Sequence, residues 1–163
     1  MSHPSLQQNT YKVISKHDVC DVVFNEKTMQ HALCASRDLE KDVIISAFTA
    51  REILTEPNFL TVQLDHQQHI LLQPDYLQYT NHSCEPNVFF DTVKMHLITI
   101  KPILQGEELC VFYPATEWDM AQPFHCQCGS KKCLNIIRGA AKIHPAILQE
   151  YRIGDFISSQ RKK

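Results

Sequence analysis

The sequence contains no apolar run that approaches the ~18 residues required of a membrane-spanning helix. Residues 1–12 are polar and lack the apolar core of a signal peptide. No stripe of basic residues exists outside the tail Arg161-Lys162-Lys163, and the formal net charge is −2. These absences predict an intracellular protein, cytoplasmic or nuclear and not secreted, that contacts no membrane and does not bind nucleic acid directly.

The cysteines do not fit a disulfide framework. Seven thiols are an odd number, and no export signal accompanies them, so metal ligation by a subset of them is the better interpretation. No internal repeat or low-complexity segment is visible. A length of 163 residues with 44% apolar side chains fits one ordinary globular domain with a single core.

Short strands dominate the expected secondary structure. Runs of β-branched and aromatic residues, separated by charged or Gly- and Pro-containing turns, predict strands, whereas helix-favouring patterns are confined to residues 139–142, 145–151 and a short turn after Gly154. The fold class is therefore mainly β with short C-terminal helices. The expected strands cover residues 19–24, 32–36, 43–48, 59–64, 69–73, 88–92, 95–100 and 109–113.

One short segment concentrates chemically active side chains: Asn81-His82-Ser83-Cys84-Glu85-Pro86-Asn87. A core strand would read as an unbroken or alternating apolar run, which this segment does not. Taken alone, it is typical of an Asx- and Pro-rich turn. Three downstream cysteines, Cys126, Cys128 and Cys133, favour a different interpretation, because they lack a fourth metal ligand that Cys84 can supply.

The three downstream thiols have the spacing Cys-x-Cys-x4-Cys around Gly129, which lets a small loop close. Structural Zn²⁺ takes four tetrahedral ligands, so this loop plus one distant thiolate predicts a zinc site. Plain buried thiols are the alternative, but the neighbouring residues are polar and basic. A redox dithiol is a poorer alternative, because its usual Cys-x-x-Cys spacing is absent. Plain core thiols are expected instead at Cys20, Cys34 and Cys110.

A second informative stretch runs from Gly106 to Tyr113. Glu107 and Glu108 are adjacent, and neighbouring side chains at the start of a strand point to opposite faces, so we expect them to be structural rather than an acid–base pair. Tyr113 ends the apolar run with a polar group beside the break at Pro114, where a pocket could open. A core tyrosine with its hydroxyl at the surface is the alternative.

In this order, the segments Asn81-His82-Ser83-Cys84-x-Pro86-Asn87, Gly106-Glu107-Glu108-Leu109-x3-Tyr113 and Cys126-x-Cys128-x4-Cys133 resemble the SET-domain protein-lysine methyltransferases with a post-SET zinc segment. The resemblance covers roughly residues 19–139. It implies the SET-domain β-clip fold of small curved sheets, with the first two segments threading past each other in a pseudoknot. The expected division is a flexible N-terminal segment (1–17), a SET domain (18–114), a post-SET zinc-binding segment (115–138) and a C-terminal helical extension (139–163).

The resemblance also assigns roles to residues. It implies that Tyr113 is catalytic, that Asn81 and His82 hold S-adenosylmethionine, and that structural Zn²⁺ is bound by Cys84, Cys126, Cys128 and Cys133. Further cofactor contacts are expected at Ala32, Leu33, Tyr79 and Phe124, and the walls of a substrate channel at Phe48, Val111 and Phe112. The implied partner is a protein or peptide substrate that carries a lysine, histone or non-histone, and we expect a monomer.

The sequence departs from the family pattern at several positions. Gln30 and Ala32 stand where a Gly-x-Gly is usual, Gln78 replaces a common arginine, and Phe48 replaces a frequent tyrosine. Val111 stands where the family tends to place an aromatic that limits the number of methyl groups, so a roomier channel is favoured. The missing glycines motivate an alternative, a catalytically weak or inactive SET-like zinc-binding interaction module.

A hydrolase built on the Cys84, His82 and Asn87 side chains is a second alternative. It fails on geometry, because a Cys–His–Asn triad brings its members together from distant parts of a chain rather than from one turn.

Overall fold

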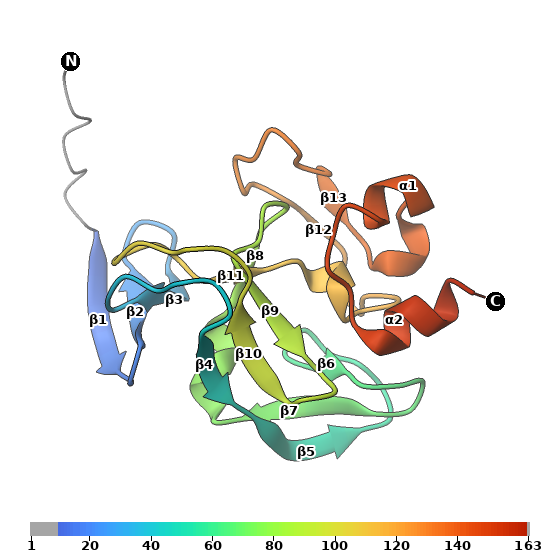
Figure 1. Cartoon of the computed structure of the whole chain (residues 1–163), viewed down its shortest axis with the longest axis horizontal. Helices are drawn as coiled ribbons and strands as arrows, with labels where there is room; N and C mark the ends of the chain where they lie inside the picture. Colours follow the sequence, from blue (N-terminus) through green and yellow to red (C-terminus); the bar gives the residue numbers. More distant parts are fainter. Residues whose placement is uncertain (1–9, 163) are drawn as a thin grey trace.

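The computed structural model describes residues 10–162, which form small β-sheets with short helices at the C-terminal end (Figure 1). The strands in order of sequence are β1 (Tyr11–Lys16), β2 (Cys20–Asn25), β3 (Gln30–Ala35), β4 (Ile44–Ala47), β5 (Thr49–Leu54), β6 (Val62–Gln63), β7 (His69–Gln73), β8 (Asn81–His82), β9 (Val88–Asp91), β10 (His96–Thr99), β11 (Cys110–Val111), β12 (Phe124–His125) and β13 (Ile136–Ile137). The helices are the 3₁₀ turns η1 (Asp75–Tyr79), η2 (Tyr113–Ala115) and η3 (Ala140–Lys142), and the α-helices α1 (Pro145–Leu148) and α2 (Asp155–Gln160). This is the mainly β fold expected from the sequence.

Within residues 10–162, the strands assemble into three three-stranded and two two-stranded sheets. The three-stranded sheets have the orders β1-β2-β3, β4-β10-β9 and β5-β7-β6, and all their neighbours are antiparallel. Neighbouring strands in the sequence form two hairpins, β6 with β7 around residues 65–68 and β9 with β10 around residues 93–94. The two-stranded sheets are β12-β13 and the parallel pair β8-β11, which brings two segments almost thirty residues apart side by side (Figure 1).

The N-terminal expectation needs a correction. Residues 1–9 lie outside the described part of the chain, but β1 occupies Tyr11–Lys16 within the segment that we expected to be flexible. Most of its side chains are exposed, so what holds the strand is its antiparallel backbone pairing with β2, from Tyr11 opposite Asn25 to Lys16 opposite Asp21. A strand held by backbone hydrogen bonds carries little of the apolar alternation that reveals a half-buried strand.

Residues 43–48 were expected to form one buried strand, but the structure ends this strand before Phe48. The chain forms β4, then turns at the buried Phe48 and continues as β5, which the sequence pattern did not predict. β5 consists mainly of exposed residues and pairs with β7 across a register irregularity between Ala50 and Glu52. The expected strand over residues 59–64 shortens to β6, and that over 109–113 shortens to β11.

The main core lies among the three-stranded sheets. Leu33, Ile70 and Leu97 are completely buried there, together with Leu109 at the start of the Tyr113 segment. Burial of such side chains contributes roughly 1.5–3 kcal/mol each, so the segments that carry the polar heptad and Tyr113 are anchored by apolar neighbours. Within the described residues, no helix is both long enough and apolar enough to cross a membrane.

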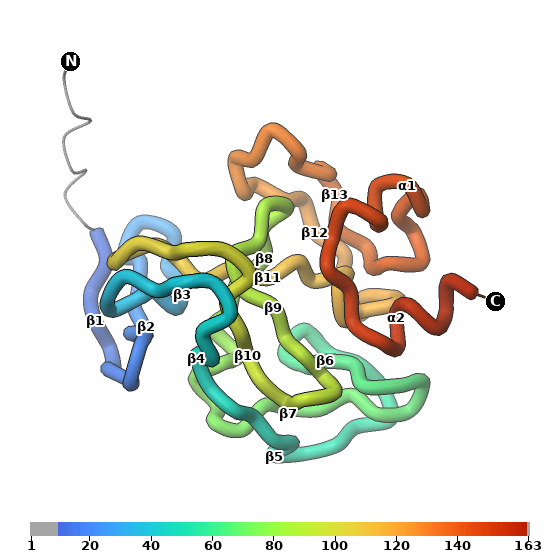
Figure 2. Tube along the Cα trace, viewed as in Figure 1, coloured from blue at the N-terminus to red at the C-terminus, as the bar shows by residue number. Residues whose placement is uncertain are grey.

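Figure 2 shows the course of the C-terminal extension in orange to red. A second core packs this extension on the sheets. Phe112 and Phe89 meet Leu148 of α1 and Ile157 of α2 in this cluster. Tyr151, between the two helices, stacks on Phe112 with ring centroids 3.7 Å apart and an interplanar angle of 6°. The extension is therefore part of the folded unit that supports the Tyr113 segment.

Candidate functional site

A cleft of about 860 Å³ opens beside the parallel pair β8-β11. Its walls come from β8, β11, the start of η2, the loop around residues 58–62 and the segment 120–128. Five residues that the sequence analysis singled out, from three separate segments, line this cleft: Asn81, His82, Val111, Tyr113 and Phe124.

The β8-β11 pairing determines this arrangement. Cys110 lies opposite Asn81, and Val111 opposite His82. The pairing is extended by two backbone hydrogen bonds, in which the Ser83 N–H donates to the Val111 carbonyl and the Asn87 N–H to the Cys110 carbonyl. The paired backbones therefore fix the side chains of Asn81, His82 and Tyr113 relative to one another on one wall of the cleft.

Asn81 anchors the end of the cleft that adjoins β3. Its amide Nδ2 donates to the His31 carbonyl at 3.0 Å and to Glu108 Oε1 at 2.8 Å. Glu108 is thus engaged with the heptad, which agrees with the structural role expected for it, whereas Glu107 accepts from the Leu104 N–H at 3.0 Å in the preceding turn.

His82 is held as a neutral imidazole. Its Nδ1 accepts a hydrogen bond from the Tyr113 N–H at 3.1 Å, so the ring proton resides on Nε2, which lies 3.4 Å from the Cys84 sulfur. Burial lowers the pKa of His82 to about 4, because the cationic form would lose its hydration. The ring therefore joins the heptad, the Tyr113 turn and the cysteine cluster without adding charge.

Tyr113 presents a neutral phenol to the cleft. Its hydroxyl donates to the Thr80 carbonyl at 3.2 Å, and burial raises the pKa of Tyr113 well above its ordinary value, with Cys110, Glu108 and Glu117 adding to the rise. The phenol can act as a hydrogen-bonding group at the cleft wall but does not ionise near neutral pH.

Glu117 is a cleft residue that the sequence did not single out. Its Oε1 accepts from the Gln63 N–H at 3.0 Å and from Thr116 Oγ1 at 3.2 Å. Burial raises the pKa of Glu117 to about 7, although both hydrogen bonds act in the opposite direction. The signal that could have revealed it is its position four residues after Tyr113, in the segment 115–138 that the sequence analysis assigned only to zinc binding.

The four cysteines predicted as metal ligands converge. The sulfurs of Cys84, Cys126, Cys128 and Cys133 all lie within 4.8 Å of one another, and the Cys84 and Cys126 sulfurs are 3.9 Å apart. Tetrahedral ligation at the usual Zn–S length separates sulfurs by about 3.8 Å, so the cluster fits a structural zinc ion. Burial alone would raise the pKa of Cys128, but hydrogen bonds from the backbone of Cys84 and Ser130 help to lower it to about 7, toward the thiolate that binds metal.

Other residues predicted for the site lie behind its walls. Leu33 and Ala32 are buried in β3, and Tyr79 stacks on His31 with ring centroids 4.7 Å apart; none of the three lines the cleft. Phe48 is buried edge-on to Phe90, which does line the cleft, at a centroid distance of 5.5 Å. Their aromatic or apolar character serves packing, which a sequence pattern does not distinguish from a ligand wall.

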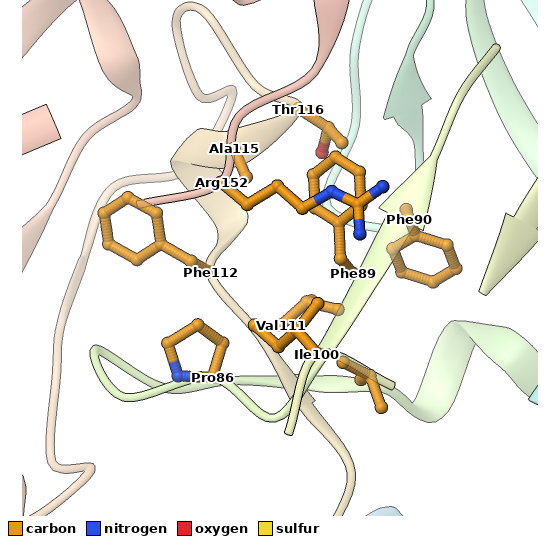
Figure 3. A pocket seen from close by; sticks show the side chains of 10 residues that line it. Pro86, Phe89, Phe90, Ile100, Val111, Phe112, Ala115, Thr116 and Arg152 are labelled. Atoms are coloured by element: carbon orange, nitrogen blue, oxygen red, sulfur yellow. The ribbon is translucent and has the colours of Figure 1, made fainter. Parts of the chain in front are cut away.

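Phe112 faces away from the cleft, into the second core. Figure 3 shows it beside Val111, Phe89 and Arg152 around a void of only about 10 Å³, with the Arg152 guanidinium 4.3 Å from the centre of the Phe89 ring. A void of that size holds at most one water molecule, so this cavity is no ligand site.

A SET-type domain is defined by three features seen together: small curved sheets, the parallel crossing of the heptad with the tyrosine segment, and an adjoining four-thiol cluster. Residues 19–114 match the family model of the SET domain, which covers more than half of the chain, so the protein belongs to the SET-domain family.

Three relatives illustrate the family. A protein named methyltransferase flvH from Aspergillus flavus is 37% identical over 115 residues, covering 69% of this chain and 64% of that protein. An H3 lysine-36 specific histone-lysine N-methyltransferase of Candida albicans is 25% identical over 148 residues, 77% of this chain and 17% of that protein. The human histone-lysine N-methyltransferase 2B is 36% identical over 62 residues, 34% of this chain and 2% of that protein. The chain thus spans under two thirds of the length of these relatives.

Among solved structures, the methyltransferase domain of human PR domain-containing protein 2 is similar, with a TM-score of 0.47 and 18% identity. The similarity covers 66% of this chain and 95% of that domain.

Proposed function

We propose that the protein transfers a methyl group from S-adenosylmethionine to the ε-amine of a lysine in a protein substrate. The observation that supports this most is the parallel pairing of β8 with β11, which sets Asn81, His82 and Tyr113 on the wall of one cleft. Membership of the SET family, and relatives named as methyltransferases, favour the same activity.

The cleft fits the proposed cofactor. Small-molecule sites commonly enclose ~300–1,000 Å³, and this cleft has about 860 Å³. Its lining includes the carboxylates of Glu108 and Glu117 and, among residues 10–162, no lysine or arginine, which suits a cationic sulfonium. Asn81, His82 and Phe124 would hold S-adenosylmethionine, which supplies a methyl group on a positively charged sulfur when bound.

The chain's own residues would align the amine and remove its water. Methyl transfer to nitrogen is an in-line displacement, which needs a neutral amine held close to the methyl group. A desolvated environment lowers the pKa of an amine, and Val111 and Phe90 provide apolar surface at the cleft. The Tyr113 hydroxyl, fixed by the Thr80 carbonyl, would position the amine, and the small Val111 leaves room for more than one methyl group.

The cysteine cluster would have a structural role. Zn²⁺ bound by Cys84, Cys126, Cys128 and Cys133 would fasten the downstream segment, which carries Phe124, to the heptad that carries His82. No step of methyl transfer requires this metal.

The substrate is proposed from the relatives. Several of them are named as histone-lysine methyltransferases, so histones are the first candidates, and such a substrate would place the protein in the nucleus. Incubation of core histones and of a cell lysate with methyl-labelled S-adenosylmethionine, followed by mass spectrometry of lysine peptides, tests both activity and target.

Tyr113→Phe tests the role of the cleft. This variant should lose at least about a hundredfold in methyl transfer while binding of S-adenosylmethionine by calorimetry survives, because the change removes only one hydroxyl at the reacting end. Tyr76→Phe, at a tyrosine of η1 that stacks on His17 and does not line the cleft, is the matched control and should keep wild-type activity. A Tyr113→Phe rate equal to that of wild type would contradict the assignment.

Calorimetry also separates the proposal from its rival, an inert zinc-clamped interaction module. That rival is motivated by Gln30 and Ala32, which stand where the family usually has glycines, and Gln30 lines the cleft. An inert module should bind no S-adenosylmethionine and should transfer no methyl group to any lysine.

A further inference from the structure

The charges of the cleft are unbalanced. Among the described residues, its lining contains two carboxylates, Glu108 and Glu117, and neither a lysine nor an arginine. Its two histidines are His82, whose Nδ1 accepts a hydrogen bond from the Tyr113 N–H, and His125, which is exposed. An occupant with positive charge would therefore meet complementary groups.

The two carboxylates belong to different parts of the cleft. Glu108 lies beside Asn81, to which it is hydrogen-bonded at 2.8 Å, and its backbone bridges to Cys34 near the end of β3. Glu117 lies beside β6, where it accepts from the Gln63 N–H. The heptad already uses the first carboxylate, so the second is the one available to a different ligand.

Glu117 is rigidly placed with respect to Tyr113. Its N–H donates to the Tyr113 carbonyl at 3.0 Å, in the turn that η2 begins. The Thr116 hydroxyl and the Gln63 N–H both bind Oε1, and Gln63 in turn accepts from the Trp118 N–H at 3.0 Å. A carboxylate anchored through one oxygen retains acceptor capacity on the other.

Glu117 also lacks a countercharge. No lysine, arginine or histidine within residues 10–162 forms an ion pair with it. A partly buried carboxylate without a cation is unfavourable, and burial accordingly raises the pKa of Glu117 to about 7. A ligand cation would relieve that cost.

We propose that Glu117 receives the ammonium group of the target lysine as it enters the cleft, which makes the site selective for a cationic amine. The identity of the amine as a lysine rests on the proposed function. Glu117 is then a specificity-determining residue next to Tyr113, while the Asn81 and Glu108 side of the cleft is left for the cofactor.

This role predicts a particular kinetic signature. An ion pair with Glu117 stabilises the incoming ammonium but not the neutral amine that reacts, so its loss weakens substrate capture more than the chemical step. Glu117→Gln should raise the KM for a lysine substrate about tenfold or more, as expected for loss of a charge-assisted hydrogen bond, with kcat changed much less. The amide oxygen of the new side chain can still accept from Gln63 and Thr116.

Binding of a small amine tests the proposal without turnover. The probe is n-butylammonium, which reproduces the end of a lysine side chain, and n-butanol is its neutral counterpart. Chemical shifts of cleft residues are followed by NMR at a pH one to two units above the pKa of Glu117. The matched control is Glu52→Gln, the same change at an exposed glutamate of β5.

Wild type and Glu52→Gln should bind n-butylammonium at the cleft, and Glu117→Gln should bind it about tenfold more weakly. Wild type should bind n-butanol no more tightly than Glu117→Gln binds n-butylammonium. Equal affinities of wild type and Glu117→Gln, or equal binding of the alcohol and the ammonium, would overturn the proposal. The binding assay uses no cofactor, so it is independent of methyl transfer. If the cleft selects the ammonium but no methyl transfer is found, this inference stands and the proposed function fails. If methyl transfer is found but the cleft does not select the ammonium, the proposed function stands and this inference fails.

Discussion

Tyr151 connects the C-terminal extension to the cysteine cluster and to the cleft at once. Its hydroxyl donates to the Cys84 carbonyl at 2.8 Å, and its ring stacks on Phe112, which directly precedes Tyr113. Removing the hydroxyl alone separates these two contacts, because Tyr151→Phe keeps the stacked ring.

Tyr151→Phe should destabilise the protein by about 1 kcal/mol, the net value of one intramolecular hydrogen bond, and by up to about 3 kcal/mol where the buried Cys84 carbonyl finds no other donor. For a domain of this size, about 1 kcal/mol corresponds to roughly 2–4 °C in Tm. Tyr151→Leu also removes the stack, which adds about 0.5–1.5 kcal/mol beyond the loss of buried area.

The measurement is urea and thermal unfolding of the full chain with zinc held at a fixed concentration, since metal bound to the native state raises apparent stability. Transfer of zinc to a chromophoric chelator is followed in parallel and should be faster for both variants. Tyr11→Phe is the control for loss of a tyrosine hydroxyl at an exposed site. Unfolding free energies of Tyr151→Phe and wild type that agree within error would refute the reasoning.

Three further predictions concern other parts of the site. Cys128→Ser should lower the zinc content measured by elemental analysis, and full occupancy in that variant would contradict the four-thiolate centre. Gly139→Ala should cost about 1–3 kcal/mol in denaturant unfolding, because φ is +110° there and a Cβ would lie 2.7 Å from the Trp118 carbonyl; wild-type stability would show that the loop can shift. Glu117 has a raised pKa in the native state, so the native chain binds more protons than the unfolded one between about pH 4.5 and pH 7, and its contribution to stability falls as the pH rises through that window. Glu117→Gln should remove that part of the pH dependence of unfolding, and an unchanged profile would show that the carboxyl is not perturbed.

The residues proposed for the site could be picked out from the sequence because their types are unusual for a core. The heptad and Cys126, Cys128 and Cys133 stand out by composition, and the structure brings all four thiols of the proposed centre together. Tyr113 stood out because an apolar run ends there, and the structure places it in the same cleft as Asn81.

Residues that act through tertiary packing were harder to predict. Phe112 and Phe48 are aromatic residues in the expected neighbourhood, yet each is buried against another aromatic ring behind the cleft, which depends on the partner that the fold supplies. β1 and β5 expose most of their side chains, so the backbone pairing that forms them left no apolar signature. Glu117 was missed because its significance depends on Gln63, which lies more than fifty residues earlier.

Because β8 pairs with β11, it cannot pair until later residues of the newly synthesised polypeptide are available. Asn81 and His82 find their partner strand only after residue 111 has emerged, and Cys84 meets its last thiol only with residue 133. Contacts between such distant positions form slowly and late. A fragment that stops at residue 114, where the family match ends, would contain Cys84 but none of Cys126, Cys128 and Cys133, the other three thiols of the proposed zinc site. We expect such a fragment to fold less stably than the full chain.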